Sequence, residues 1–111
     1  GCGGDRARTK RPVRGRFAAE LADFVIVTSD NPRTEDPMAI INEILPGVKE
    51  FSTPYAVEPD RVKAIHYAMD HAQPGDVIIL AGKGHEDYQE IDHKHYPMDE
   101  RIIVAEHLKH E

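Results

Sequence analysis

Short apolar runs alternate along this chain with longer stretches in which apolar residues recur at helical spacing. Residues 23–28 and 77–81 are continuous runs rich in Val and Ile, which is typical of strands buried on both faces of a sheet. A shorter run, Tyr55-Ala56-Val57, predicts a third strand. Since helical patterns separate these runs, the order predicts a mainly parallel sheet.

Four segments carry apolar residues on one helical face. Asp36 followed by Pro37 predicts the start of the second helix, Pro46-Gly47 predicts its end, and Asp60 predicts the start of the third. The predicted inward faces are Val13, Phe17, Ala18 and Leu21 in 13–22; Met38, Ile41, Ile44 and Leu45 in 37–45; Val62, Ile65, Met69 and Ala72 in 60–72; and Ile102, Ala105 and Leu108 in 99–109.

The region after the third apolar run predicts a hairpin at the sheet edge. Residues 88–91 form an edge strand in this interpretation, and Asp92-His93-Lys94-His95 forms a tight turn. The full order of elements predicts an α/β fold, a three-layer sandwich with a mainly parallel sheet and an antiparallel edge hairpin.

Composition narrows the class of protein. With 111 residues, 40% hydrophobic and 31% charged, the chain is expected to form one globular domain. A net charge of -6 argues against nucleic-acid binding, and no apolar run approaches the roughly 20 residues of a membrane span. One cysteine excludes an internal disulfide and a thiolate zinc site, and it fits a reducing compartment. The glycine-rich start, Gly1 to Gly4, is expected to follow a strand of a longer chain.

Three loops are expected at the same end of the sheet, namely residues 1–11, 28–34 and 82–87. In the second loop Arg33 can bind a carboxylate through two parallel hydrogen bonds, and Asn31 can donate and accept. Asp30 and Glu86 can accept hydrogen bonds from ammonium groups. Together they predict a site for a zwitterionic small molecule. The alternative is a plain turn at Asp30-Asn31 beside a surface arginine.

Other candidate chemistry is less specific. Gly82-Lys83-Gly84 lacks the Ser or Thr that follows Lys in a Walker A loop, so it is either a loose anion nest or turn geometry. His85 is read as a hydrogen-bonding strut in preference to an acid/base, and His93 and His95 lack further ligands for a metal site. A basic cluster in the first segment is either a solvated end or an anion-binding rim: Arg6, Arg8, Lys10, Arg11, Arg14 and Arg16.

Three motifs together resemble the C-terminal domain of the Mur ligases, and among these the diaminopimelate-adding members. They are Gly1-Cys2-Gly3-Gly4-Asp5-Arg6 with Lys10-Arg11-Pro12, Thr28-Ser29-Asp30-Asn31-Pro32-Arg33 with Glu35 and Pro37, and Ala81-Gly82-Lys83-Gly84-His85-Glu86-Asp87-Tyr88-Gln89. The resemblance covers nearly the whole chain. It implies a Rossmann-like domain, residues 1–111, of a three-domain enzyme.

The resemblance also implies a reaction. It is the ATP-dependent addition of meso-diaminopimelate to UDP-MurNAc-L-Ala-D-Glu in cytoplasmic peptidoglycan synthesis. ATP and Mg²⁺ would be bound mainly by the two preceding domains, so no cofactor, metal ligand or catalytic residue is expected in this chain. The chain alone is therefore expected to be inactive, and neither nucleic acid nor a membrane is expected as a partner.

Residue roles follow from the same resemblance. Asp30, Asn31 and Arg33 match the amino-acid selection motif, in which Arg33 would bind the far carboxylate of meso-diaminopimelate. Gly82, through its backbone, and Glu86, through its charge, match positions that hold the distal amino and carboxyl groups. The remaining matches are Arg6, which would contact the substrate, and Lys10 and Arg11, which would face the nucleotide or phosphates.

The sequence leaves alternatives open. The sister lysine-adding ligases and the folylpolyglutamate-type ligases share the architecture, and Arg33 is the residue that discriminates, because lysine has no second carboxylate. A non-catalytic α/β binding module is the alternative of another class. Two departures from the family pattern, Ala7 and Arg14, lie in or beside the first loop and bear on Arg6 more than on Arg33.

Overall fold

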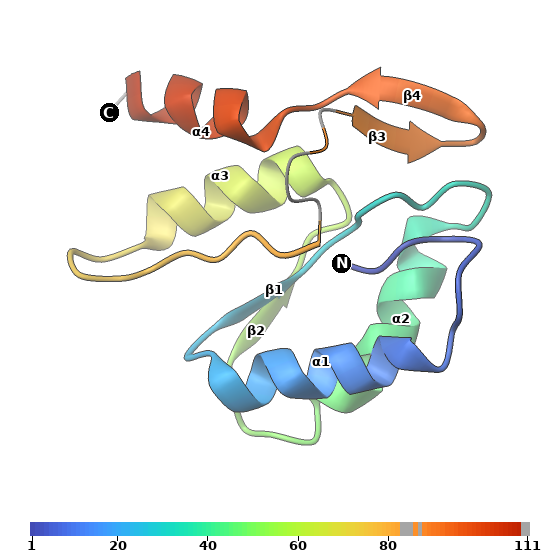
Figure 1. The fold of residues 1–111 in the computed structure, drawn as a ribbon. Helices are drawn as coiled ribbons and strands as arrows, with labels where there is room; N and C mark the ends of the chain where they lie inside the picture. The colour runs from blue at the N-terminus through green and yellow to red at the C-terminus, as the bar shows by residue number, and fades with distance from the viewer. Residues whose placement is uncertain (83–85, 87, 110–111) are drawn as a thin grey trace.

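The computed structural model describes residues 1–82, 86 and 88–109, and shows a mixed α/β domain (Figure 1). The elements are, in chain order, α1 (Lys10–Leu21), β1 (Val25–Val27), α2 (Pro37–Val48), β2 (Tyr55–Val57), α3 (Arg61–His71), β3 (Tyr88–Ile91), β4 (Lys94–Pro97) and α4 (Glu100–Lys109). None of the helices in these ranges has the length and apolar character needed to cross a bilayer.

Two small sheets form the β structure. β1 and β2 pair in parallel with Val25 opposite Tyr55, and β3 and β4 pair antiparallel with Tyr88 opposite Pro97. The predicted strand at 55–57 and the predicted hairpin are confirmed, and the strand predicted at 23–28 is limited to Val25–Val27. The turn is shorter than the predicted 92–95, because β4 already begins at Lys94. The hairpin turns through Asp92 and His93, whose positive φ angles of 50° and 63° match the twist of the flanking strands.

The core lies where α1 and α2 pack against β1. It contains Cys2, Ala19, Val25, Val27, Ile40, Ile41, Ile44 and Val48. The two helices approach at backbone distance, since a Cβ added at Gly47 would lie 1.8 Å from the Pro12 carbonyl oxygen. A Cβ at Gly15 would likewise lie 2.4 Å from the Ile44 carbonyl oxygen. Two glycines therefore make this tight contact possible.

The predicted inward face of α1 is wrong. Phe17 is 52% exposed and Leu21 is 83% exposed, and Val13 and Ala18 are exposed as well. The buried residues are Arg11, Gly15 and Ala19. Because the contact with α2 requires small residues, the apolar periodicity marked the wrong face.

The predicted start of α2 is confirmed and its predicted end is not. The Asp36 carboxylate accepts a hydrogen bond from the Met38 N–H at 2.9 Å, and Pro37 occupies the first turn. The helix continues through Pro46 to Val48, because Gly47 serves the contact with α1 and does not end the helix. α1 begins at Lys10, so the first loop is also shorter than the predicted 1–11.

The strand predicted at 77–81 does not form. A strand requires a neighbour that supplies backbone hydrogen bonds, and no segment in the described part of the chain forms a ladder with these residues. Val77 and Ile79 are 85% and 82% exposed, and the segment runs alone past α3 (Figure 1). Among the described residues the only parallel ladder is thus β1 with β2, beside an isolated parallel bridge between Arg33 and Ile91.

The last two helices lie against each other (Figure 1). The predicted stripe of α3 is confirmed by the burial of Ile65, and the Asp60 carboxylate accepts from the Lys63 N–H at 3.2 Å. The bounds predicted for α4 are confirmed, but its predicted face is wrong, because Ile102 and Leu108 are exposed. The half-buried residues of α4 are Ile103, Val104 and His107, and the His107 Nδ1 lies 2.6 Å from the Nδ1 of His66 on α3.

Candidate functional site

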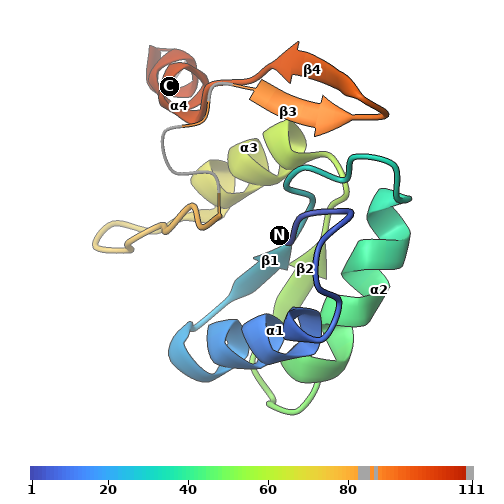
Figure 2. The same ribbon diagram turned by 45° about the vertical axis from the view of Figure 1, so that its right-hand side comes forward.

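The first loop, the loop after β1 and the segment around Gly82 meet in one place. The dark blue N-terminal segment lies beside the loop after β1 in both views (Figures 1 and 2). The first loop, the first turns of α1, the loop after β1 and Glu86 line a pocket of about 330 Å³. Its lining includes five of the predicted site residues: Arg6, Asp30, Asn31, Arg33 and Glu86. The sixth, Gly82, lies next to the pocket, since a Cβ added there would lie 3.7 Å from Asp30 Oδ2.

Arg33 has a backbone conformation that few residues other than glycine adopt. Its φ is 52°, and its peptide group is held from both sides by the β3–β4 hairpin. The Arg33 N–H donates to the Glu90 carbonyl at 3.0 Å, and its carbonyl accepts from the Asp92 N–H at 2.6 Å. Backbone strain that the surrounding structure maintains is a property of functional sites.

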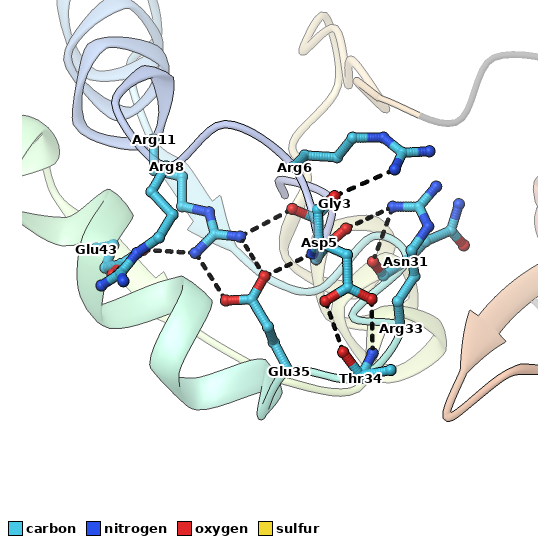
Figure 3. Close-up of polar contacts among 11 residues, drawn as sticks. Gly3, Asp5, Arg6, Arg8, Arg11, Asn31, Arg33, Thr34, Glu35 and Glu43 are labelled. Carbon is cyan, nitrogen blue, oxygen red and sulfur yellow. Dashed lines mark hydrogen bonds and ion pairs between the residues drawn. The ribbon is translucent and has the colours of Figure 1, made fainter.

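The Arg33 side chain is only partly used by the protein. Nη1 donates to the Gly4 carbonyl at 2.9 Å, and Nε lies 3.4 Å from Glu90 Oε1. Nη2 has no hydrogen-bond partner among the described residues, and the side chain is 17% exposed. Arg33 and Arg6 both line the pocket, and Figure 3 draws their side chains. This wall of the pocket is therefore suited to a carboxylate or another anion.

Asn31 fastens the site loops together. It is 2% exposed, and its Oδ1 accepts from the Glu90 N–H at 2.9 Å. Its carbonyl accepts from the Gly4 N–H at 2.7 Å. The Asn31 carboxamide thus connects the loop after β1 to β3. A plain Asx turn, the alternative considered from the sequence, would bond only to nearby residues of its own loop.

The pocket also contains two carboxylates. Asp30 and Glu86 are half-buried and line it together with the arginines. Gln89 Nε2 holds the Asp30 segment by donating to the Asp30 carbonyl at 2.6 Å and to Ser29 Oγ at 2.9 Å. The Glu86 carboxylate raises the pKa of Tyr88, because a negative charge nearby disfavours the phenolate. The lining also includes Lys10, Arg11 and Arg14, so cationic groups outnumber the two carboxylates around this pocket. A ligand with both ammonium and carboxylate groups, and more than one carboxylate, complements it.

Arg11 lines the inner side of this pocket and is buried. It is 1% exposed, and its Nη2 donates to the Gly3 carbonyl at 3.0 Å (Figure 3). Its guanidinium also pairs with Glu35 at 2.8 Å and with Glu43. These bonds raise the pKa of Arg11 and lower the pKa of Glu35 from its ordinary 4.5 to about 2. Arg11 therefore supports the first loop from inside.

Asp5 closes the same loop from outside. Its φ is 54°, and its carboxylate accepts from Thr34 Oγ1 at 2.6 Å (Figure 3). Its N–H donates to Glu35 Oε2 at 2.6 Å. Gly4 fits here because a Cβ would lie 1.8 Å from the Pro32 carbonyl oxygen.

Several residues that shape the site were not predicted. They are Glu35, Arg61, Gln89 and Glu90. Each of their contacts joins residues 24 to 59 positions apart in the chain. A pattern of neighbouring residues therefore does not predict these contacts.

Residues with possible metal or acid/base roles are placed as follows. His85, Lys83 and Gly84 lie outside the described residues. His95 stacks on Tyr88 with ring centroids 4.2 Å apart, and His93 is in the hairpin turn. No group of three or more His, Cys, Asp or Glu side chains in the described ranges could hold a metal ion.

Known proteins share this sequence and fold. Residues 1–84 match the family model described as "Mur ligase, glutamate ligase domain". A UDP-N-acetylmuramoyl-L-alanyl-D-glutamate–2,6-diaminopimelate ligase of Solibacter usitatus is 52% identical over 98% of this chain and 22% of its own length. The ligase of the same name from Synechococcus elongatus is 63% identical over 80% of this chain and 18% of its own length.

A solved structure agrees with the sequence comparison. The structure of a UDP-N-acetylmuramoyl-L-alanyl-D-glutamate–2,6-diaminopimelate ligase superposes with a TM-score of 0.93 and 42% identity, over 100% of this chain and 23% of that protein. This chain thus spans about a fifth of the length of the relatives it matches. With this match in sequence and in fold, the chain belongs to the Mur ligase family and corresponds to its glutamate ligase domain.

Proposed function

We propose that this chain is the amino-acid-binding domain of a cytoplasmic ligase that adds meso-diaminopimelate to UDP-MurNAc-L-Ala-D-Glu with ATP in peptidoglycan synthesis. The observation that carries the proposal is Arg33, held in a strained backbone at the pocket with Nη2 unpaired among the described residues. The diaminopimelate in the relatives' names favours the same substrate. In the longer protein the domain forms one of three and completes a three-layer Rossmann-like sandwich.

The charges of the pocket fit the two ends of meso-diaminopimelate. The molecule carries two carboxylates and two ammonium groups. Arg33 and Arg6 supply donors for a carboxylate, while Asp30 and Glu86 supply acceptors for an ammonium group. Asn31 holds the loop after β1 against β3, and its amide is available to hydrogen-bond the ligand. Gly82 would bind the ligand through its backbone.

Lysine is rejected by the same pocket. Lysine lacks the second carboxylate of diaminopimelate, so its binding would leave the Arg33 guanidinium without an anion. A polar site that loses its ligand partner discriminates strongly against the analogue. This argument favours diaminopimelate over the lysine-adding and folylpolyglutamate-type alternatives. It also disfavours a non-catalytic binding module, because such a module has no need of an arginine in a strained backbone conformation.

ATP and Mg²⁺ are assigned to parts of the longer protein outside this chain. The sequence contains no Walker A loop, and the described residues contain no carboxylate cluster suited to a metal ion. Lys10 and Arg11, which line the pocket, would face the phosphates of a nucleotide bound mainly by the rest of the protein. Accordingly, the chain by itself binds and orients the amino acid and does not form the amide bond.

The test is Arg33→Ala in the full-length ligase that contains this chain. The KM for meso-diaminopimelate should rise about 10- to 100-fold, as expected from losing charge-assisted hydrogen bonds. Its preference for diaminopimelate over lysine should fall with it. Steady-state kinetics with each amino acid measure both effects. Arg16→Ala is the matched control, because Arg16 is an exposed arginine outside the pocket lining.

The proposal fails if Arg33→Ala leaves the KM for diaminopimelate unchanged while Arg16→Ala behaves like the parent enzyme. It also fails if the isolated chain catalyses ATP-dependent ligation. Titration calorimetry on the isolated chain adds a third check, since a pocket that closes only in the full enzyme should bind the amino acid weakly.

A further inference from the structure

Arg61 is a buried arginine outside the pocket lining. It is the first residue of α3, directly after the capping residue Asp60, and it is 3% exposed. An arginine this deeply buried needs partners for its charge and its N–H groups. Those partners come from three separate parts of the chain.

Each side of the Arg61 guanidinium reaches a different segment. Nε donates to Glu100 Oε2 at 2.9 Å, at the start of α4. Nη1 donates to the Ser29 carbonyl at 3.1 Å, and Nη2 donates to the Ala81 carbonyl at 3.0 Å. The Glu100 side chain is 8% exposed, so the ion pair is shielded from water.

Two of these partners are next to predicted site residues. Ser29 precedes Asp30, and Ala81 precedes Gly82. The segments that carry them form no backbone ladder with each other in the described residues. One guanidinium therefore bonds to both segments and holds them at a fixed separation. With that separation, a Cβ added at Gly82 would lie 3.7 Å from Asp30 Oδ2.

We infer that Arg61 is a positioning residue for the amino-acid site. It sets the distance between the Asp30 loop and the described segment that ends at Gly82, and it connects both to α4 through Glu100. The inference rests on the proposed function, because it takes these two segments to hold the amino acid.

The geometry requires arginine and not simply a positive charge. A guanidinium presents its donors in a rigid planar fork, so it can reach two carbonyls and a carboxylate at once. A lysine ammonium is a point charge on a flexible chain. Arg61→Lys should keep the charge opposite Glu100 but lose at least one of the bonds to Ser29 and Ala81.

The test is Arg61→Lys in the full-length ligase. The KM for meso-diaminopimelate should rise about 10-fold, which corresponds to losing one hydrogen bond to a charged donor. The KM values for ATP and the UDP-linked substrate should stay within about twofold, since the bonds of Arg61 go to the two amino-acid segments and to α4. Arg101→Lys is the matched control, because Arg101 follows Glu100 but is 74% exposed at its side chain.

A second measurement reports on the loops themselves. Amide hydrogen exchange in the isolated chain should become faster in peptides covering 28–31, where Thr28, Ser29 and Asn31 are buried, when Arg61 is lysine. Exchange in α2 should stay unchanged. A purely structural role for Arg61 predicts faster exchange throughout or a lower melting temperature with no change in the KM for diaminopimelate, and either result overturns the inference.

Glu100→Gln keeps the inference testable if Arg61→Lys does not fold. The amide retains an acceptor for Arg61 Nε and removes only the charge, so the KM for diaminopimelate should rise a few-fold. An unchanged KM in this variant overturns the inference. Failure of the proposed function is distinguished by Arg33→Ala: if that variant changes the KM and the Arg61 and Glu100 variants do not, only the positioning role is wrong.

Discussion

Two buried arginines organise two regions of this domain in different ways. Arg11 pairs with Glu35 and Glu43, whose side chains are 27% and 26% exposed. Arg61 pairs with Glu100 alone, at 8% exposure, and its other bonds go to two backbone carbonyls. The Arg11 guanidinium has two carboxylate partners that are partly exposed to solvent. The Arg61 guanidinium has one carboxylate partner, and that partner is buried.

The difference follows from what surrounds each arginine. Arg11 lies in the region where α1 and α2 meet at backbone distance over the main core, so the fold there has other sources of stability. Arg61 lies where α3, α4 and the 77–81 segment meet with few buried apolar residues. A buried polar group matters most where packing alone does not determine the arrangement.

Removing each arginine tests this comparison most strongly. Arg61→Met should lower the free energy of unfolding by about 3–5 kcal/mol, because it leaves a buried carboxylate without its partner. Arg11→Met should cost less, since water reaches both of its carboxylates. Urea unfolding of the isolated chain measures both values. Arg101→Met, at an exposed pair, should cost less than about 1 kcal/mol, and a larger cost for Arg11→Met than for Arg61→Met contradicts the comparison.

Adding one methyl group at the α1–α2 contact should have the next largest effect. Gly47→Ala places a Cβ against the Pro12 carbonyl oxygen, at 1.8 Å before relaxation, so we expect a loss of about 1–3 kcal/mol. At an unhindered helical site the same substitution stabilises by about 0.5–1 kcal/mol. The sign of the change in thermal unfolding is thus diagnostic, and a stabilised variant would show that the helices do not approach at backbone distance.

Acid should loosen the Arg11 region through Glu35, with the smallest effect of the three. Its pKa falls from 4.5 to about 2 in the folded chain, mainly through the hydrogen bond from Arg11. The folded state then binds fewer protons than the unfolded state, so this contribution is complete above about pH 4.5 and is lost as the pH falls towards 2. Glu35→Gln should flatten the melting temperature between pH 5 and pH 2, and an unchanged slope would assign the acid sensitivity to other groups.

Local signals in the sequence were sufficient for much of the fold. Asp36-Pro37 and Asp60 marked the starts of α2 and α3 because capping and a proline in the first turn act within a few residues. The hairpin was predictable for the same reason. The inward faces of α1 and α4 were not, because the burial of a helix face depends on which neighbour packs against it.

The candidate site divides in the same way. The sequence by itself determined which side chains could recognise a zwitterion, since Asp30, Arg33 and Glu86 follow from charge, hydrogen-bonding capacity and motif. Only the tertiary structure decided that Arg11 and Arg61 lie beneath the loops, and that the 77–81 run forms no strand with any described segment of this chain. Caps and turns are local interactions, whereas salt bridges and strand pairing need a partner from a distant segment, and only folding brings that partner into contact.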